Sequence, residues 1–175
     1  MFPRLLTWVL VPVLVAGAGF GLYWFQPWRL ATDTTVADEV PVVATPTTSP
    51  SAGASPVGNR LVATGSFVTH EHETSGRVQL IERPDGRHQL VLIGLRTSDG
   101  PDLRVWLTDQ AVRPGRPGWH VFDDGRYLEV AALRGNRGDQ VYDLPVAAEL
   151  DGLRSVTVWC KRFSVSFGAA ELTLA

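Results

Sequence analysis

Two kinds of side chain in this sequence could carry out redox or metal chemistry: a single thiol and a pair of closely spaced imidazoles. Cys160 is the only cysteine among 175 residues, and His70 and His72 stand two positions apart. A lone thiol cannot form a disulfide within its own chain, so Cys160 is a packing residue, half of an intermolecular bridge, or a redox group or cofactor ligand. One cysteine also excludes a disulfide scaffold and a self-contained four-cysteine zinc or iron–sulfur site.

The residues before Cys160 indicate which way its side chain points. Side chains alternate across a strand, so within residues 155–160 the apolar Val156, Val158 and Cys160 share one face. This pattern directs the thiol toward the core, where apolar surroundings raise the pKa of a thiol and lower its reactivity. Inert packing is therefore one interpretation of Cys160, and a redox role is the other.

The residues after Cys160 break the alternation. From Phe163 onward the apolar residues occupy odd instead of even positions. A β-bulge near Lys161 and Arg162 would produce this shift, and bulges are over-represented beside functional sites; a tight turn would serve as well. The two cations would favour a thiolate if the sulfur reaches solvent. Trp159, Lys161, Arg162 and Phe163 are thus the neighbours of the candidate redox site.

His70 and His72 form a second candidate site, for a metal ion. If their segment is extended, the two imidazoles share a face and could chelate a metal. The following Thr-Ser-Gly at positions 74–76 is typical of a loop, where exposed polar side chains are ordinary, so a surface role stays open. A blue-copper site is disfavoured because neither a histidine nor a methionine follows Cys160. The chain lacks the Cys-x-x-Cys-His motif of c-type haem, but a non-covalent haem ligated by Cys160 or by His72 stays open.

The N-terminal residues predict a membrane helix. Residues 5–25 carry no charge, and at about 1.5 Å per residue they can cross a bilayer core of roughly 30 Å. Trp8 at one end and Tyr23, Trp24 and Trp28 at the other suit the two membrane interfaces. A cleaved signal peptide is the alternative, because the Ala-Gly-Ala at positions 16–18 resembles a cleavage site. The apolar run continues past that site, which favours an uncleaved anchor.

These features divide the chain into a cytoplasmic stub (1–4), an anchor (5–25), a linker (26–58) and a domain (59–175). The prolines among Thr, Ser, Ala and Val predict that the linker is an extended spacer between the membrane and the domain. Arg4 lies before the anchor, so the positive-inside rule predicts a single-pass protein of the cell membrane with an extracytoplasmic domain. From Arg60 onward, 14 Lys and Arg nearly balance 15 Asp and Glu, which argues against nucleic acid as a partner.

The domain is predicted to be all-β. Short runs rich in Val, Leu, Phe and Trp are separated by frequent turn residues, and no run has a helical period long enough for a stable helix. We expect an antiparallel β-sandwich or barrel of about eight short strands. These strands are predicted over residues 61–68, 76–83, 88–95, 103–108, 127–133, 140–144, 155–160 and 163–167.

Several motifs along the domain match one known family. They are Gly65-Ser66-Phe67; His72 with Thr74-Ser75-Gly76; Asp99-Gly100-Pro101-Asp102-Leu103 with Val105-Trp106-Leu107; Gly138, Gln140, Tyr142 and Pro145; and Val158-Trp159-Cys160-Lys161-Arg162-Phe163 with Val165, Phe167-Gly168, Ala170 and Leu172. Through these residues the chain resembles the DM-thirteen family of electron-transfer domains. The resemblance implies an all-β extracytoplasmic domain with a redox-active cysteine and a haem-type cofactor. In animals and plants such domains adjoin cytochrome-like DOMON domains, so a separate redox partner protein is implied here.

Two functions follow from the sequence. The first is a membrane-tethered redox module that uses Cys160. The second is a non-catalytic module on a stalk that binds a cell-surface polymer or a protein or serves as a scaffold, with Trp106, Trp119, Tyr127 and Trp159 as its contacts. No Gly-x-Ser-x-Gly or His-Glu-x-x-His motif occurs, so an electron-transfer or binding module is favoured over a hydrolytic enzyme.

Overall fold

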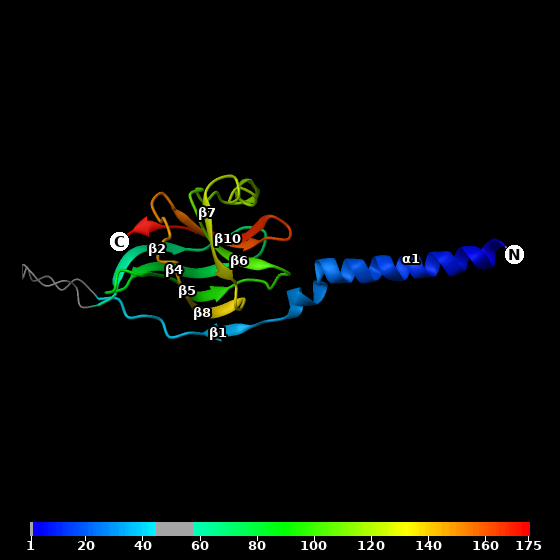
Figure 1. The fold of residues 1–175 in the computed structure, drawn as a ribbon, viewed down its shortest axis with the longest axis horizontal. Coiled ribbons are helices and arrows are strands. Elements are labelled where there is room, and N and C mark those ends of the chain that lie inside the picture. Colours follow the sequence, from blue (N-terminus) through cyan, green and yellow to red (C-terminus); the bar gives the residue numbers. More distant parts are fainter. Residues whose placement is uncertain (1, 45–57) are drawn as a thin grey trace, which may run out of the picture.

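Two β-sheets packed face to face form the domain, and a long N-terminal helix extends from one end of it (Figure 1). This computed structural model describes residues 2–44 and 58–175. One sheet has the strand order β1-β8-β5-β4-β2-β11, and the other has the order β3-β10-β9-β6-β7. All neighbouring strands are antiparallel except β1 and β8, which are parallel.

The strands are short and are joined mostly by turns. Their bounds are β1 Thr35–Ala37, β2 Arg60–Ser66, β3 Val68–Thr69, β4 Ser75–Glu82, β5 His88–Arg96, β6 Leu103–Thr108, β7 Tyr127–Ala132, β8 Arg137–Asp143, β9 Ser155–Cys160, β10 Val165–Glu171 and β11 Thr173–Leu174. The helices are α1 Phe2–Phe25 and two short 3-10 helices, η1 Pro27–Ala31 and η2 Arg116–Gly118.

The predicted strands correspond to observed ones, and the architecture is a sandwich. β6 and β9 have the predicted bounds. The prediction over residues 61–68 corresponds to two strands, β2 and β3. The other five predictions correspond to β4, β5, β7, β8 and β10 and differ from them by a few residues at the ends. The shift in alternation after Cys160 is a tight turn over residues 161–164, which leads directly into β10. Ser164 completes that turn with a φ of 50°.

The five-stranded sheet is covered on both faces. Its inner face packs on the six-stranded sheet in one apolar core, which includes Val156, Val158 and Cys160. The loop between β6 and β7 folds over the outer face, where Phe122 packs on Trp106 and Trp159. All six residues of β9 are therefore buried. The prediction that Trp106 and Trp159 are exposed contact residues is wrong, since only 2% and 1% of their surfaces are exposed.

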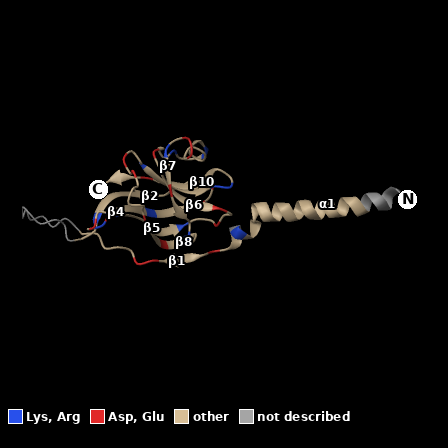
Figure 2. Cartoon of the chain, in the orientation of Figure 1, with Lys and Arg blue, Asp and Glu red and all other residues tan. Residues whose placement is uncertain are grey.

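α1 is apolar and solvent-facing. Figure 2 shows no charged residue along the coloured part of α1, whereas charges of both signs are spread over the domain. The apolar stretch Trp8–Arg29, which begins in α1 and runs into η1, is long enough to cross a membrane and has a mean hydropathy of 1.8. None of this stretch is buried against the domain. A helix of this kind at an N-terminus is either a membrane anchor or a signal sequence.

The chain after α1 runs along the domain before it enters the main fold. β1 pairs with the edge strand β8, and Asn136 holds this segment by accepting from the Thr34 amide (2.7 Å) and donating to Asp33 (2.9 Å). Farther on, Val43 bridges to Asn59. Residues 26–44 of the predicted linker are thus held to the domain at several points by side-chain and main-chain bonds to distant residues. The rest of the predicted linker, residues 45–57, lies outside the described residues.

The β1–β8 contact depends on a glycine. Gly138 has a φ of +94°, and a Cβ there would collide with the main-chain oxygen of Val36. We expect Gly138→Ala to lower the free energy of unfolding by about 2–3 kcal/mol, because the new methyl group is strained and displaces β1. Urea denaturation measures the loss. Gly86→Ala is the matched control, since Gly86 has a φ of +77° with open space around it, and it should cost only about 1 kcal/mol. Equal losses would contradict the contact.

Candidate functional site

Cys160 lies at the end of the sandwich from which α1 extends. It is the last residue of β9 and pairs with Val165 of β10 on one side and with Leu103 of β6 on the other. The turn of residues 161–164 follows it at once. We call this end of the domain, with Cys160, that turn, His72 and Asp99–Pro101, the thiol pole.

The thiol of Cys160 is fully buried. It belongs to the apolar core between the sheets, as the alternation of β9 predicted, and none of its surface is exposed. Burial raises the pKa of the thiol, because the charged thiolate loses its hydration. Main-chain groups of Phe163, Arg162 and Asp102 act in the opposite direction and lower that pKa, but they do not outweigh burial. At neutral pH Cys160 is therefore a protonated thiol, which is a poor nucleophile.

The two cations beside Cys160 interact elsewhere. The Lys161 ammonium lies 3.0 Å from a Glu129 carboxylate oxygen. Arg162 donates to the main-chain oxygens of Tyr23 and Trp24 in the last turn of α1, over 3.3 Å and 2.8 Å. Neither side chain is therefore placed to favour a thiolate at Cys160 in this conformation.

His72 lies at the thiol pole beside a small apolar cavity. Its ring is half-buried and packs on Phe167, with 4.0 Å between ring centroids. Burial lowers the pKa of His72, and the nearby Glu71 carboxylate partly opposes this. The cavity, of about 220 Å³, is lined by the end of α1 and by the thiol pole; the lining includes Phe25, Arg29, His72, Gly100, Phe163 and Phe167.

His70 faces a different layer of the fold. Its ring stacks on Phe122 of the covering loop, and its Nδ1 lies 2.7 Å from the Ser166 hydroxyl. Ser166 in turn lies 2.8 Å from the Thr157 hydroxyl. His70 and His72 thus contact opposite sides of the five-stranded sheet and do not share the face that an extended segment would give them. Within residues 2–44 and 58–175, no three His, Cys, Asp or Glu side chains gather as a metal site.

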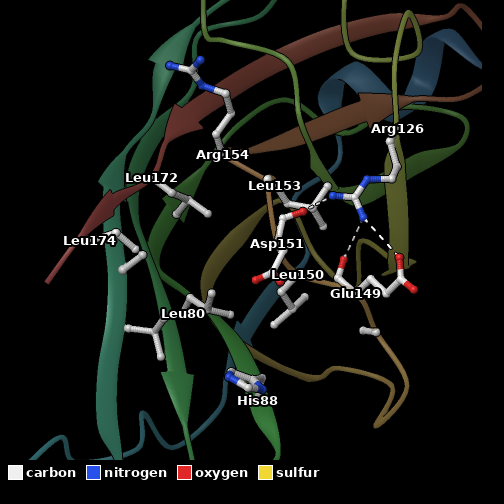
Figure 3. Close-up of a pocket in the computed structure, with 14 residues that line it drawn as sticks. Leu80, His88, Arg126, Glu149, Leu150, Asp151, Leu153, Arg154, Leu172 and Leu174 are labelled. Carbon is white, nitrogen blue, oxygen red and sulfur yellow. Dashed lines mark hydrogen bonds and ion pairs between the residues drawn. The ribbon is translucent and has the colours of Figure 1, made fainter.

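A larger groove lies at the opposite pole. It has a volume of about 990 Å³ and opens between the ends of the two sheets, where Figure 3 shows leucine side chains gathered below Arg126 and Arg154. Arg126 donates to the main-chain oxygens of Glu149 and Asp151, and Arg154 pairs with Glu171. The apolar lining comprises Val62, Ala63, Leu80, Ala148, Leu150, Leu153, Leu172 and Leu174.

The thiol pole does not fit a haem ligated by Cys160 in this conformation. Cys160 lines neither the small cavity nor the larger groove. The small cavity is also below the range of roughly 300–1,000 Å³ that is usual for ligand and cofactor sites. The larger groove has the volume, but its imidazole, His88, lies at the far pole.

The buried imidazole of His70 makes stability depend on pH. Burial lowers the pKa of His70, so the folded chain binds a proton there less readily than the unfolded chain, whose pKa is about 6.5. The free energy of unfolding should therefore be highest above pH 6.5 and fall as the pH is lowered from about 7 to 5. Urea denaturation at several pH values measures this fall. His70→Asn should make the fall smaller, and an unchanged pH dependence in that variant would contradict the assignment.

Comparison with known proteins gives one match. A family model described as electron transfer DM13 matches residues 66–172, a range that contains Cys160, His72 and every strand from β3 to β10. No curated protein and no solved structure matches the chain.

Proposed function

This chain belongs to the electron transfer DM13 family, and on that premise we propose that it is a membrane-anchored extracytoplasmic electron-transfer module with Cys160 as its redox group. The observation that carries the proposal is the place of Cys160. It is the only thiol in the chain, and it lies at the pole where the apolar helix ends. The charge-free stretch of residues 5–25 supports an anchor, and Arg4 on its N-terminal side supports the extracytoplasmic orientation by the positive-inside rule.

Electron exchange at a lone thiol takes the form of a mixed disulfide. After losing its proton, the Cys160 sulfur attacks one sulfur of a disulfide-bearing partner and forms a new S–S bond. The partner's other sulfur leaves with the electron pair of the broken bond and takes up a proton. Cys160 is oxidised and the leaving sulfur is reduced, so electrons and protons balance.

Because the Cys160 thiol is buried, this exchange requires local opening of the fold. Because the thiol is sealed and protonated in the resting fold, the turn of residues 161–164 must open before a disulfide can reach the sulfur. Phe163 and Arg162 hold that turn against α1, through a ring stack with Phe25 and through bonds to helix carbonyls. Loosening the turn should therefore speed the exchange.

The test uses the full chain in lipid nanodiscs with oxidised glutathione. We expect a slowly formed adduct that maps to Cys160 and is reversed by a reductant, and Phe163→Ala should raise its rate at least about 10-fold, as local opening becomes easier. Val146→Ala, at an exposed position in the far loop, is the control and should leave the rate unchanged. If the native chain never forms the adduct while the denatured chain does, the redox proposal fails.

Two observations, the larger groove at the pole opposite Cys160 and the burial of the Cys160 thiol, favour a second function. This function is a binding or scaffolding module for a cell-surface polymer or protein. Of the predicted aromatic contacts, Tyr127 is exposed and Trp119 is half-buried, so these two remain as contacts, together with the groove in Figure 3. This function requires cell-surface binding that persists in Cys160→Ala and is lost in Leu174→Glu, which places a charge in the groove. The reverse result would exclude it.

A further inference from the structure

The turn after Cys160 is bonded to the end of α1. Arg162 donates to the carbonyls of Tyr23 and Trp24, and its guanidinium lies 5.4 Å from the centre of the Trp24 ring. The next residue, Phe163, stacks on Phe25 with 5.8 Å between ring centroids. The last turn of the helix and the turn that follows Cys160 are therefore in direct contact.

A second set of bonds holds the other side of the thiol pole. Arg29 of η1 donates to the main-chain oxygen of Gly100 over 3.1 Å and lies 3.5 Å from the Asp99 carboxylate. The Thr32 hydroxyl donates to the same carboxylate over 3.1 Å. The chain that leaves the helix is thus fixed to the domain within a few residues of the helix end.

The described part of the predicted spacer, residues 26–44, does not hold the helix apart from the domain. β1 lies between them in sequence and is already part of a sheet, and Val43 and Ala44 meet Asn59 at the far pole. Val43 and Asn59 therefore lie together where β2 starts, at the end of the domain remote from the helix (Figure 1). The distance between helix and domain is set by the contacts of Arg162, Phe163 and Arg29.

The surface around these contacts has the composition of a membrane interface. Tyr23, Trp24 and Trp28 are 66%, 41% and 52% exposed, and Phe163 of the turn is 38% exposed. Trp and Tyr side chains are enriched at the level of the lipid headgroups, because their apolar ring atoms can contact lipid while their polar atoms hydrogen-bond to water. Lys161 and Arg162 already have partners in the protein, so this surface does not require anionic lipids.

From these contacts we infer that the thiol pole rests on the headgroup region of the bilayer that α1 spans, with the turn of residues 161–164 and Trp28 in contact with lipid. The partner of this surface is the lipid bilayer itself, zwitterionic lipid being sufficient. The inference rests on the proposed function only in that α1 stays in the mature chain as an anchor. It does not depend on redox activity at Cys160.

The test places an environment-sensitive bimane label on Ser164→Cys in the full chain, in phosphatidylcholine nanodiscs that carry headgroup nitroxide quenchers. A matched label on Val146→Cys reports the far pole, which is about 20 Å away along the six residues of β9. We expect quenching at least about 5-fold stronger at position 164 than at position 146, because a nitroxide must come close to the fluorophore to quench it and the two positions are about 20 Å apart. Wild-type chain labelled in parallel measures the background from Cys160, and intact mass confirms that the helix is retained.

Removing the contacts should change the result in a defined direction. Arg162→Ala combined with Phe163→Ala should weaken the quenching at position 164 toward the value at position 146, while Arg87→Ala at the far hairpin should leave it unchanged. Equal quenching at both positions in the otherwise unchanged chain would overturn the inference. Because this readout is positional, it can fail while the glutathione adduct forms, or succeed while the adduct does not.

Discussion

Alkylation of Cys160 in the folded chain is expected to be about 100- to 10,000-fold slower than alkylation of the same thiol in urea. The sulfur is sealed in the core, so a reagent reaches it only through local opening, and each factor of ten in protection corresponds to about 1.4 kcal/mol of opening free energy. Burial also raises the pKa of the thiol, which reduces the thiolate fraction in the folded state.

The rate is measured with a small maleimide or iodoacetamide at neutral pH, followed by intact mass. Ser164→Cys supplies the control, because its added thiol lies in the exposed part of the same turn and should react at nearly the unfolded rate. Protection of Cys160 by less than about 10-fold would show that the pole is open in solution. The mixed-disulfide chemistry would then not require the opening of the turn that we propose.

Trp159→Ala is expected to lower the free energy of unfolding by about 3–5 kcal/mol, the usual cost of removing a large buried aromatic side chain. Trp159 is 1% exposed and packs between Trp106, with 5.1 Å between ring centroids, and Phe122, at 6.3 Å. Its loss would free the covering loop from the outer face of the sheet. Chemical denaturation measures the change.

The exposed Tyr127 is the control for this prediction. It stacks on the other face of Trp106 with ring centroids 4.0 Å apart but remains 44% exposed, so Tyr127→Ala should cost only about 1 kcal/mol. A loss below about 1 kcal/mol for Trp159→Ala would mean that Trp159 is a surface residue in solution. Trp159 would then again be a candidate contact residue for the proposed binding function.

The strands of the sandwich and the inward direction of Cys160 could be predicted because both depend on local sequence. Alternation over residues 155–160 places the thiol on the core face, and the change of parity at Phe163 marks the tight turn. Such patterns are set by neighbouring residues along one strand.

The outer layer could not be predicted in this way. Alternation places Trp159 opposite the core, and only the folded loop that carries Phe122 shows that this face is covered as well. The strand Thr35–Ala37 was missed because its partners, Asn136 and β8, lie about a hundred residues away. The bonds of Arg162 to the helix end are also between residues remote in sequence and have no local signal.

Val43 and Asn59 meet in a β-bridge, so the two ends of the segment that joins them in sequence lie at one point. Because Val43 and Asn59 are fixed together, doubling the number of residues between them would add only about 0.6 kcal/mol of loop-closure entropy. Insertions between Val43 and Asn59 should therefore leave the contacts of Arg162 and Phe163 with the helix end unchanged. In the membrane arrangement that we propose, such changes in length would not alter how the domain rests on the bilayer.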